Sequence, residues 1–141
     1  MSAYADTSFL VSLYIADANS APAARVVESR PALFLTPLGE LELVNALELA
    51  RFRRQFPVAQ IRASQAAFRE DIQGGVYTLE PIPPAAFELS ARIARRRSAR
   101  MGTRTLDILH VACALLFRSE RFLTFDERQR RLARAEGLKI R

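Results

Sequence analysis

The sequence predicts an α/β fold of three layers, α/β/α, in which helices cover both faces of a central, mostly parallel sheet of four to five short strands. Short apolar runs alternate with longer segments of helical character along the chain, and this alternation is typical of parallel strands joined by right-handed helical crossovers. The 141 residues are 50% hydrophobic and contain no linker, repeat or low-complexity segment. This size and composition predict a single domain over residues 1–141 with a substantial core.

The expected strands are short apolar runs bounded by proline, glycine or charged residues. They cover residues 2–5, 32–36, 76–79, 121–124 and, as an edge strand, 137–140. The expected helices cover residues 7–17, 20–29, 37–55, 58–72, 85–100, 103 or 105 to 117, and 126–136.

Cap and turn residues mark where several of these helices begin and end. Pro22 stands in the first turn of the second helix, and Thr36-Pro37 places a capping hydroxyl before a proline at the first helical position. Pro57 ends the helix that begins there, and Gly102 closes the helix that starts near residue 85. The segment that follows Gly102 is apolar on nearly every side, which predicts a central, buried helix.

The charge of the chain points to an anionic partner. The net charge is +6, and Lys139 is the only lysine among the 21 basic residues. Arginine suits bidentate contacts to phosphate, so a basic domain of this kind is expected to bind nucleic acid first of all. Charge that serves only solubility, or the codon usage of a GC-rich genome, would explain the same composition.

Composition also limits the compartment and the metal. No apolar run approaches the roughly 20 residues that span a bilayer, and we see no secretory signal, so we expect no membrane partner. The single Cys113 fits a reducing compartment, which predicts a cytoplasmic protein. With one histidine and one cysteine, a structural zinc site is nearly excluded. Any bound metal is expected on oxygen ligands, which favours Mg²⁺ or Mn²⁺.

Two acidic residues, Asp6 and Asp126, each follow a predicted strand and open a predicted helix. In an open α/β sheet, ligands bind in the crevice at the carboxyl ends of the strands, where both side chains would lie. Each acid taken alone is equally well explained as the N-cap of its helix.

A third acid is expected on an apolar helix face. At about 100° per residue, Glu42 falls among the apolar side chains of Leu38, Leu49, Phe52 and Phe56. Glu40 instead faces the side of the helix that carries arginines. This placement favours Glu42 over Glu40 as a site residue. The alternative is an acid at the border of the apolar stripe that pairs with Arg53.

Asp107 lies near the start of the most apolar helix. The helix dipole stabilises an acid there by about 0.3–1 kcal/mol, which is less than the several kcal/mol that an unpaired buried carboxylate costs, so we expect a cationic partner. His110 lies one turn further on the same face, either as a base or as a histidine that forms hydrogen bonds within the core. Cys113 is expected to be a small core residue.

Four carboxylates in one place would repel one another, and divalent cations remove this repulsion. Cations held in this way activate a water and stabilise the attacking and leaving oxygens of phosphoryl chemistry. Other phosphoryl-transfer sites match less well. Ser8 stands where a phosphatase with an aspartyl nucleophile would have a second aspartate, and the chain has no glycine-rich phosphate loop that ends in Lys-Ser or Lys-Thr.

Five motifs carry a family resemblance along the whole chain. They are residues 4–8 (Tyr-Ala-Asp-Thr-Ser), 42–47 (Glu-Leu-Val-Asn-Ala-Leu), 105–112 (Thr-Leu-Asp-Ile-Leu-His-Val-Ala), 122–128 (Phe-Leu-Thr-Phe-Asp-Glu-Arg) and 133–138 (Ala-Arg-Ala-Glu-Gly-Leu). In this order and spacing the sequence resembles the PIN-domain family, and most closely the ribonuclease toxins of the VapC type from bacterial toxin–antitoxin pairs.

The resemblance implies a metal-dependent endoribonuclease that cleaves single-stranded RNA by two-metal-type phosphodiester hydrolysis. It also implies a homodimer and a cognate antitoxin protein that blocks the site. The catalytic residues and Mg²⁺ (or Mn²⁺) ligands that it implies are Asp6, Glu42, Asp107 and Asp126. The supporting polar groups that it implies are Ser8 or Thr7, and Asn45 or Thr124.

An arginine-rich segment, residues 92–104, directly precedes Asp107. We expect it to lead an RNA backbone to the metals, with an affinity that falls steeply with salt, although a solvated helix face would have the same composition. The candidate RNA contacts are Arg96, Arg97, Arg100 and Arg104. The alternative function is a catalytically silent PIN-like module that binds nucleic acid or protein, needs no metal and tolerates Asp107→Asn.

Overall fold

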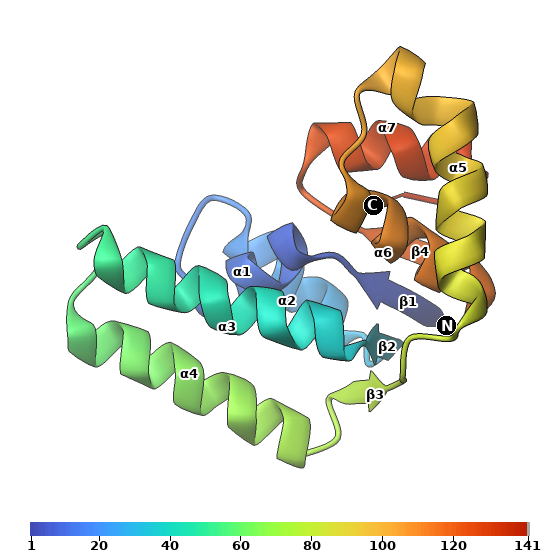
Figure 1. The fold of residues 1–141 in the computed structure, drawn as a ribbon. Helices are drawn as coiled ribbons and strands as arrows, with labels where there is room; N and C mark the ends of the chain where they lie inside the picture. The colour runs from blue at the N-terminus through green and yellow to red at the C-terminus, as the bar shows by residue number, and fades with distance from the viewer. Residues whose placement is uncertain (141) are drawn as a thin grey trace.

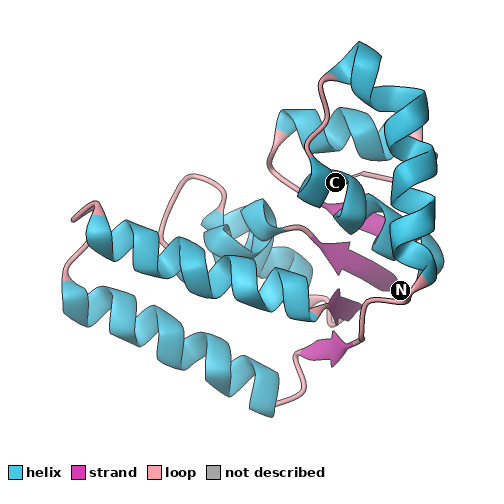
Figure 2. Ribbon diagram, viewed as in Figure 1, coloured by secondary structure: helices cyan, strands magenta, loops and turns pink. Residues whose placement is uncertain are grey.

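The computed structural model describes residues 1–140 and confirms the predicted α/β class (Figures 1 and 2). The sheet has four parallel strands in the order β3-β2-β1-β4. The strands are β1 (Ser2–Ala5), β2 (Ala32–Leu35), β3 (Tyr77–Leu79) and β4 (Arg121–Leu123). The helices are α1 (Thr7–Tyr14), α2 (Ser20–Glu28), α3 (Pro37–Phe52), α4 (Val58–Gln73), α5 (Ala85–Met101), α6 (Thr105–Leu116) and α7 (Glu127–Ala135).

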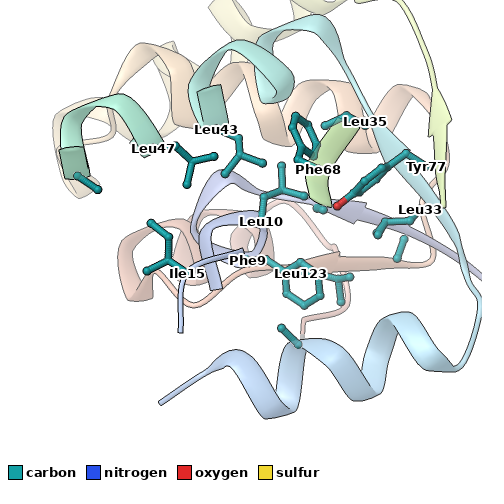
Figure 3. Packing of buried hydrophobic residues seen from close by; sticks show 14 of the residues in the cluster. Phe9, Leu10, Ile15, Leu33, Leu35, Leu43, Leu47, Phe68, Tyr77 and Leu123 are labelled. Carbon is teal, nitrogen blue, oxygen red and sulfur yellow. The ribbon is translucent and has the colours of Figure 1, made fainter. Parts of the chain in front are cut away.

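Helices cover both faces of the sheet, as the alternation of segments predicted. Successive strand side chains point to opposite faces, and β1 divides its residues in this way: Ala3 and Ala5 pack with α1–α4, whereas Tyr4 packs with α5–α7. Figure 3 shows the first of these clusters, in which Leu43 of α3 and Phe68 of α4 lie in the layer of buried side chains beside the sheet. Both faces are apolar because every crossover leaves a helix on the sheet.

The local signals for helix boundaries act as expected. The Thr36 hydroxyl accepts a hydrogen bond from the Gly39 N–H (3.2 Å) and caps α3 ahead of Pro37. Gly102 takes φ 63°, a left-handed conformation that glycine adopts without strain, and ends α5.

Three predicted elements differ from the structure. The helix expected over residues 37–55 ends at Phe52, and Arg54 takes a left-handed φ of 52° just beyond it. The first helix ends at Tyr14 rather than at residue 17, because the Asp17 carboxylate accepts hydrogen bonds from the Asn19 N–H (2.7 Å) and the Ser20 hydroxyl and forms a turn there. The expected edge strand over 137–140 is reduced to one parallel bridge between Phe122 and Ile140, so the described residues form four strands.

The strand order fixes where a ligand site is expected. The chain adds β2 and β3 on one side of β1, then crosses to the other side to place β4 next to β1. Ligands of open α/β sheets bind at such a switch point, outside the carboxyl ends of the strands. The last paired residues there are Ala5 and Leu123, and the Asp6 N–H continues the ladder to the Leu123 carbonyl (3.0 Å).

Candidate active site

Asp6 lies at this switch point, nearly buried, directly after β1. Its Oδ1 accepts a hydrogen bond from the Thr7 N–H (2.6 Å), as an N-cap of α1 does. Its Oδ2 accepts from the hydroxyls of Ser8 (3.2 Å) and Thr124 (2.7 Å). Asp6 is therefore both a helix cap and the centre of a polar network that joins two strand ends.

The hydroxyl groups around Asp6 are themselves held by the backbone that follows β4. The Ser8 hydroxyl accepts from the Phe125 N–H (3.0 Å), and the Thr124 hydroxyl accepts from the Asp126 N–H (3.1 Å). The two hydroxyls also lie 3.1 Å from each other, so they form one polar triangle with Asp6 Oδ2. The structure thus brings Ser8 and Thr124 into contact with Asp6.

Asp126 and Asp107 are linked through Arg104. Asp126 caps α7, since its Oδ1 accepts from the N–H groups of Arg128 (2.8 Å) and Gln129 (3.2 Å). Arg104 Nε donates to Asp107 Oδ2 (3.0 Å), and Arg104 Nη2 lies 3.9 Å from Asp126 Oδ2. Arg104 is thus the cationic partner expected for Asp107, although its guanidinium remains largely exposed.

Glu42 reaches the site from α3 through a contact that the sequence did not reveal. Its carboxylate Oε1 is hydrogen-bonded to His110 Nε2, and the His110 Nδ1 lies 2.7 Å from the Tyr4 hydroxyl. His110 is 1% exposed. The expectation that His110 forms hydrogen bonds within the core is confirmed, with a site acid as one of its partners.

The helical face that singled out Glu42 is buried only in part. Leu38 is partly buried against the cluster that contains Tyr4, and Phe56 is partly buried against the cluster that contains Ala3 and Ala5. The buried residues of α3 are Gly39, Leu43, Leu47 and Ala50. Leu49 and Phe52, which were expected beside Glu42 on a buried face, are exposed, Phe52 by 83%. The apolar pattern of α3 has two sides: the side that contains Leu43 and Leu47 is fully buried, whereas the other is buried only near the start of the helix, at Leu38.

Burial sets the protonation behaviour of the site. Burial raises the pKa of the Asp6 carboxyl, and the nearby Asp107 charge adds to this increase, while His110 and the Thr124 hydrogen bond oppose it. For His110, burial would lower the pKa, but the hydrogen bond to Glu42 and the charge of Asp6 raise it above the usual range. The charges of Asp6, Glu42 and Asp107 all favour the protonated form of His110.

The donor groups of the site fit a divalent metal ion by their chemistry. Within residues 1–140, no group of three or more His, Cys, Asp or Glu side chains is arranged as a ready coordination shell. The chemistry of the donors nevertheless fits Mg²⁺ or Mn²⁺, which prefer carboxylate and hydroxyl oxygens. A buried carboxylate with a raised pKa is also a group whose ionised form a cation would stabilise.

The remaining candidate polar groups are less engaged. Thr7 contributes its N–H to Asp6, and its buried hydroxyl has no hydrogen-bond partner among the described residues. Asn45 is exposed on α3, and the described part of the chain shows no side-chain hydrogen bond for it. The roles of both in the site remain predictions.

The four candidate arginines of residues 92–104 have three different surroundings. Arg96 and Arg97 bind the Glu136 carboxylate after α7, with Arg97 Nε at 3.1 Å and Arg97 Nη2 at 2.9 Å from Glu136 Oε2. Arg100 is exposed and makes no ion pair within residues 1–140. Arg104 lies at the acids. Glu136 is thus a structural partner that the sequence did not point out, because nothing in its local pattern links it to α5.

The fold and this site define a class of protein. A profile of the PIN domain matches residues 3–135, so the chain belongs to the PIN-domain family, whose members are typically metal-dependent nucleases. None of its described helices is long and apolar enough to cross a membrane.

Solved structures share this fold at low sequence identity. A Mycobacterium tuberculosis toxin, VapC20, which cleaves the sarcin–ricin loop, has a TM-score of 0.70 at 21% identity and aligns over 97% of this chain and 96% of its own. The FitAcB structure from Neisseria gonorrhoeae has a TM-score of 0.69 at 14% identity and aligns over 98% of this chain and 95% of its own. A protein from Pyrobaculum aerophilum, PAE2754, has a TM-score of 0.68 at 18% identity and aligns over 99% of this chain and 83% of its own. No curated protein sequence matches the chain significantly.

Proposed function

We propose that residues 1–141 form a single nuclease domain that cleaves single-stranded RNA in a reaction that depends on Mg²⁺ or Mn²⁺. The observation that carries this proposal is the buried Asp6 carboxylate at the switch point, held by Ser8 and Thr124 and influenced by Asp107. A buried acid that is held in place by two hydroxyls at the crevice of the sheet has the character of a ligand site rather than of a simple helix cap.

The four acids would hold the metal, and their neighbours would orient them. Asp6, Glu42, Asp107 and Asp126 supply the oxygens that the bound ion requires. When bound, the ion supplies an activated water and stabilises charge on the phosphate. Arg104 lies between two of the acids with an exposed guanidinium, where it can pair with a phosphate of the substrate.

The toxin role and the partners are part of the same proposal. VapC20 is a toxin by its description, and it shares the fold of this chain. A cognate antitoxin protein would then block the site. A homodimer is supported by three exposed apolar residues of α3, Leu41, Val44 and Phe52, which lie on one side of the helix at a helical spacing.

One observation favours the alternative of a catalytically silent module that binds nucleic acid or protein. In the part of the chain that the structure describes, the carboxylates do not form a ready metal shell, and Arg104 bridges two of them. A module of this kind would bind RNA equally well with and without metal.

The test uses the purified protein with single-stranded and structured RNAs, in Mn²⁺ or in EDTA. We expect cleavage of single-stranded RNA in Mn²⁺ and none in EDTA, and Asp6→Asn should abolish it. Glu28→Gln, which changes an exposed acid of α2 away from the site, serves as the matched control and should cleave as the wild type does. Cleavage that survives EDTA, or that is unchanged in Asp6→Asn, would refute the proposal.

A further inference from the structure

One chain of hydrogen bonds crosses the α5–α7 side of the molecule and ends at a site acid. It runs from the Tyr4 hydroxyl to His110 Nδ1 (2.7 Å) and from His110 Nε2 to Glu42 Oε1. It joins β1, α6 and α3, which are far apart in sequence. Tyr4 and His110 are both 1% exposed, so water does not compete for these bonds.

The far end of this chain is rigid. The Tyr4 ring stacks on Phe122 with centroids 5.7 Å apart and an angle of 4°, and it also stacks on Phe117 at 6.2 Å. The same strand places Asp6 two residues later. A fixed phenol on β1 therefore sets the orientation of the imidazole, and the imidazole sets the position of Glu42.

The direction of the His110–Glu42 hydrogen bond follows from the charge of Glu42, because an ionised carboxylate can only accept. If the Tyr4 hydroxyl donates to Nδ1, the proton of a neutral imidazole resides on Nε2; if the imidazole is charged, Nε2 is protonated as well. In both cases His110 Nε2–H donates to Glu42. The ionised Glu42 accepts this bond on Oε1. Among residues 1–140, no protein donor contacts its other oxygen, Oε2.

Glu42 depends on this contact more than the other acids do on theirs. Asp6 is held by a backbone N–H and two hydroxyls, and Asp126 by two backbone N–H groups. Among the described residues, His110 is the only side-chain or backbone donor to the Glu42 carboxylate. A glutamate has more rotatable bonds than an aspartate, so an unheld Glu42 would lose more conformational entropy when it binds an ion.

We propose that His110 is a positioning residue, which Tyr4 orients and which holds the Glu42 carboxylate in place for a divalent cation. Groups that orient metal ligands in this way typically contribute about 10- to 100-fold to metal affinity. This inference rests on the proposed metal-dependent function and adds two residues, Tyr4 and His110, to the support of its site.

The test measures Mn²⁺ binding by the intact protein, from the electron paramagnetic resonance signal of free Mn²⁺, so that it does not depend on cleavage. Tyr4→Phe removes one hydroxyl and keeps the stacked ring, and we expect it to weaken Mn²⁺ binding about 10-fold. The matched control is Tyr77→Phe, which removes a buried hydroxyl that contacts Tyr14 on the opposite side of the sheet. It should leave Mn²⁺ affinity unchanged.

Two further variants separate positioning from a merely structural role. His110→Gln keeps an N–H that can reach Glu42, whereas His110→Met removes both ring nitrogens and so both hydrogen bonds. His110→Gln should therefore retain more Mn²⁺ affinity than His110→Met. In a Glu42→Gln background, Tyr4→Phe should have no further effect on Mn²⁺ binding, because Tyr4 acts only through Glu42. Thermal unfolding of each variant checks that it is folded. If His110→Met does not fold, the Mn²⁺ affinity of Tyr4→Phe alone tests the positioning role.

The outcomes distinguish the two levels of the proposal. Wild-type affinity for Mn²⁺ in Tyr4→Phe and in a folded His110 variant overturns the positioning role and leaves the nuclease proposal intact. An additive effect of Tyr4→Phe and Glu42→Gln also overturns it. If the wild-type protein binds no Mn²⁺, both the proposed function and this inference fail.

Discussion

The ion-pair cluster between α5 and the end of α7 allows a prediction about stability to be worked out. The Glu136 side chain is 4% exposed and receives Arg96 on one oxygen and Arg97 on the other. Arg97 also donates to the Ala135 carbonyl (2.8 Å). Glu136→Gln keeps the shape of the side chain and removes its charge, so it isolates the value of this cluster.

The magnitude follows from burial and from the number of bonds. Hydrogen bonds to charged groups contribute roughly 1.5–3 kcal/mol each, and three donors meet the Glu136 carboxylate. The guanidiniums of Arg96 and Arg97 are 50% and 33% exposed and can return to water, which reduces the loss. We expect Glu136→Gln to lower the free energy of unfolding by about 2 kcal/mol, or the Tm by roughly 8 °C for a chain of this length.

Thermal and urea unfolding of the metal-free protein provide the assay. The matched control is Glu88→Gln, which removes the exposed Arg92–Glu88 pair (3.3 Å) on the same helix and should cost less than about 0.5 kcal/mol. A loss in Glu136→Gln no larger than in Glu88→Gln would show that the cluster acts as an ordinary surface ion pair, and the reasoning from burial would be refuted.

Other predictions concern the site, the surface and the core. Asp6→Asn should raise the free energy of unfolding of the metal-free protein by about 1 kcal/mol in calorimetry, because burial raises the pKa of Asp6 and disfavours its charge; a loss of stability would contradict this. Arg100→Gln should weaken RNA binding, lower the slope of log affinity against log salt by about 1, and leave the Tm unchanged. Phe52→Glu should weaken a homodimer by about 100-fold or more in sedimentation, whereas a monomeric wild type would refute that interface. Burial raises the pKa of the Cys113 thiol to about 11, so the folded state holds this proton more tightly than the unfolded state. The contribution of the Cys113 thiol to the free energy of unfolding should fall as the pH rises from roughly 8.5 to about 11. Urea titrations across this pH range should show the fall in the wild type, and Cys113→Ala should remove it.

The layers and most helix boundaries were predictable because they depend on local chemistry. Thr36 and Gly102 act as the cap and the terminator that their residue types predict. The alternation of strands and helices sufficed for the parallel sheet. The strand order was not predictable, since it depends on the crossing from β3 to β4, which no local signal specifies.

The candidate site was predictable in part. Asp6 and Thr124 could be placed near each other because both follow strands. Glu42 was selected from a helical face that is buried at Leu38 but exposed at Leu49 and Phe52, because α3 is apolar on two sides and periodicity cannot tell which of them meets the sheet. The pairing of Glu42 with His110 joins residues 68 positions apart, and a single sequence holds no record of such a contact.

The central place of β1 has a consequence for synthesis of the chain. Asp6 is held by Thr124, which lies 118 positions later, and β1 has β4 as its neighbour on one side. A growing polypeptide therefore exposes one edge of its first strand until β4 (Arg121–Leu123) has left the ribosome. The acids from β1 and α3 exist early, but the hydroxyl and the acid that follow β4 join them only then, so a nascent chain has no complete site.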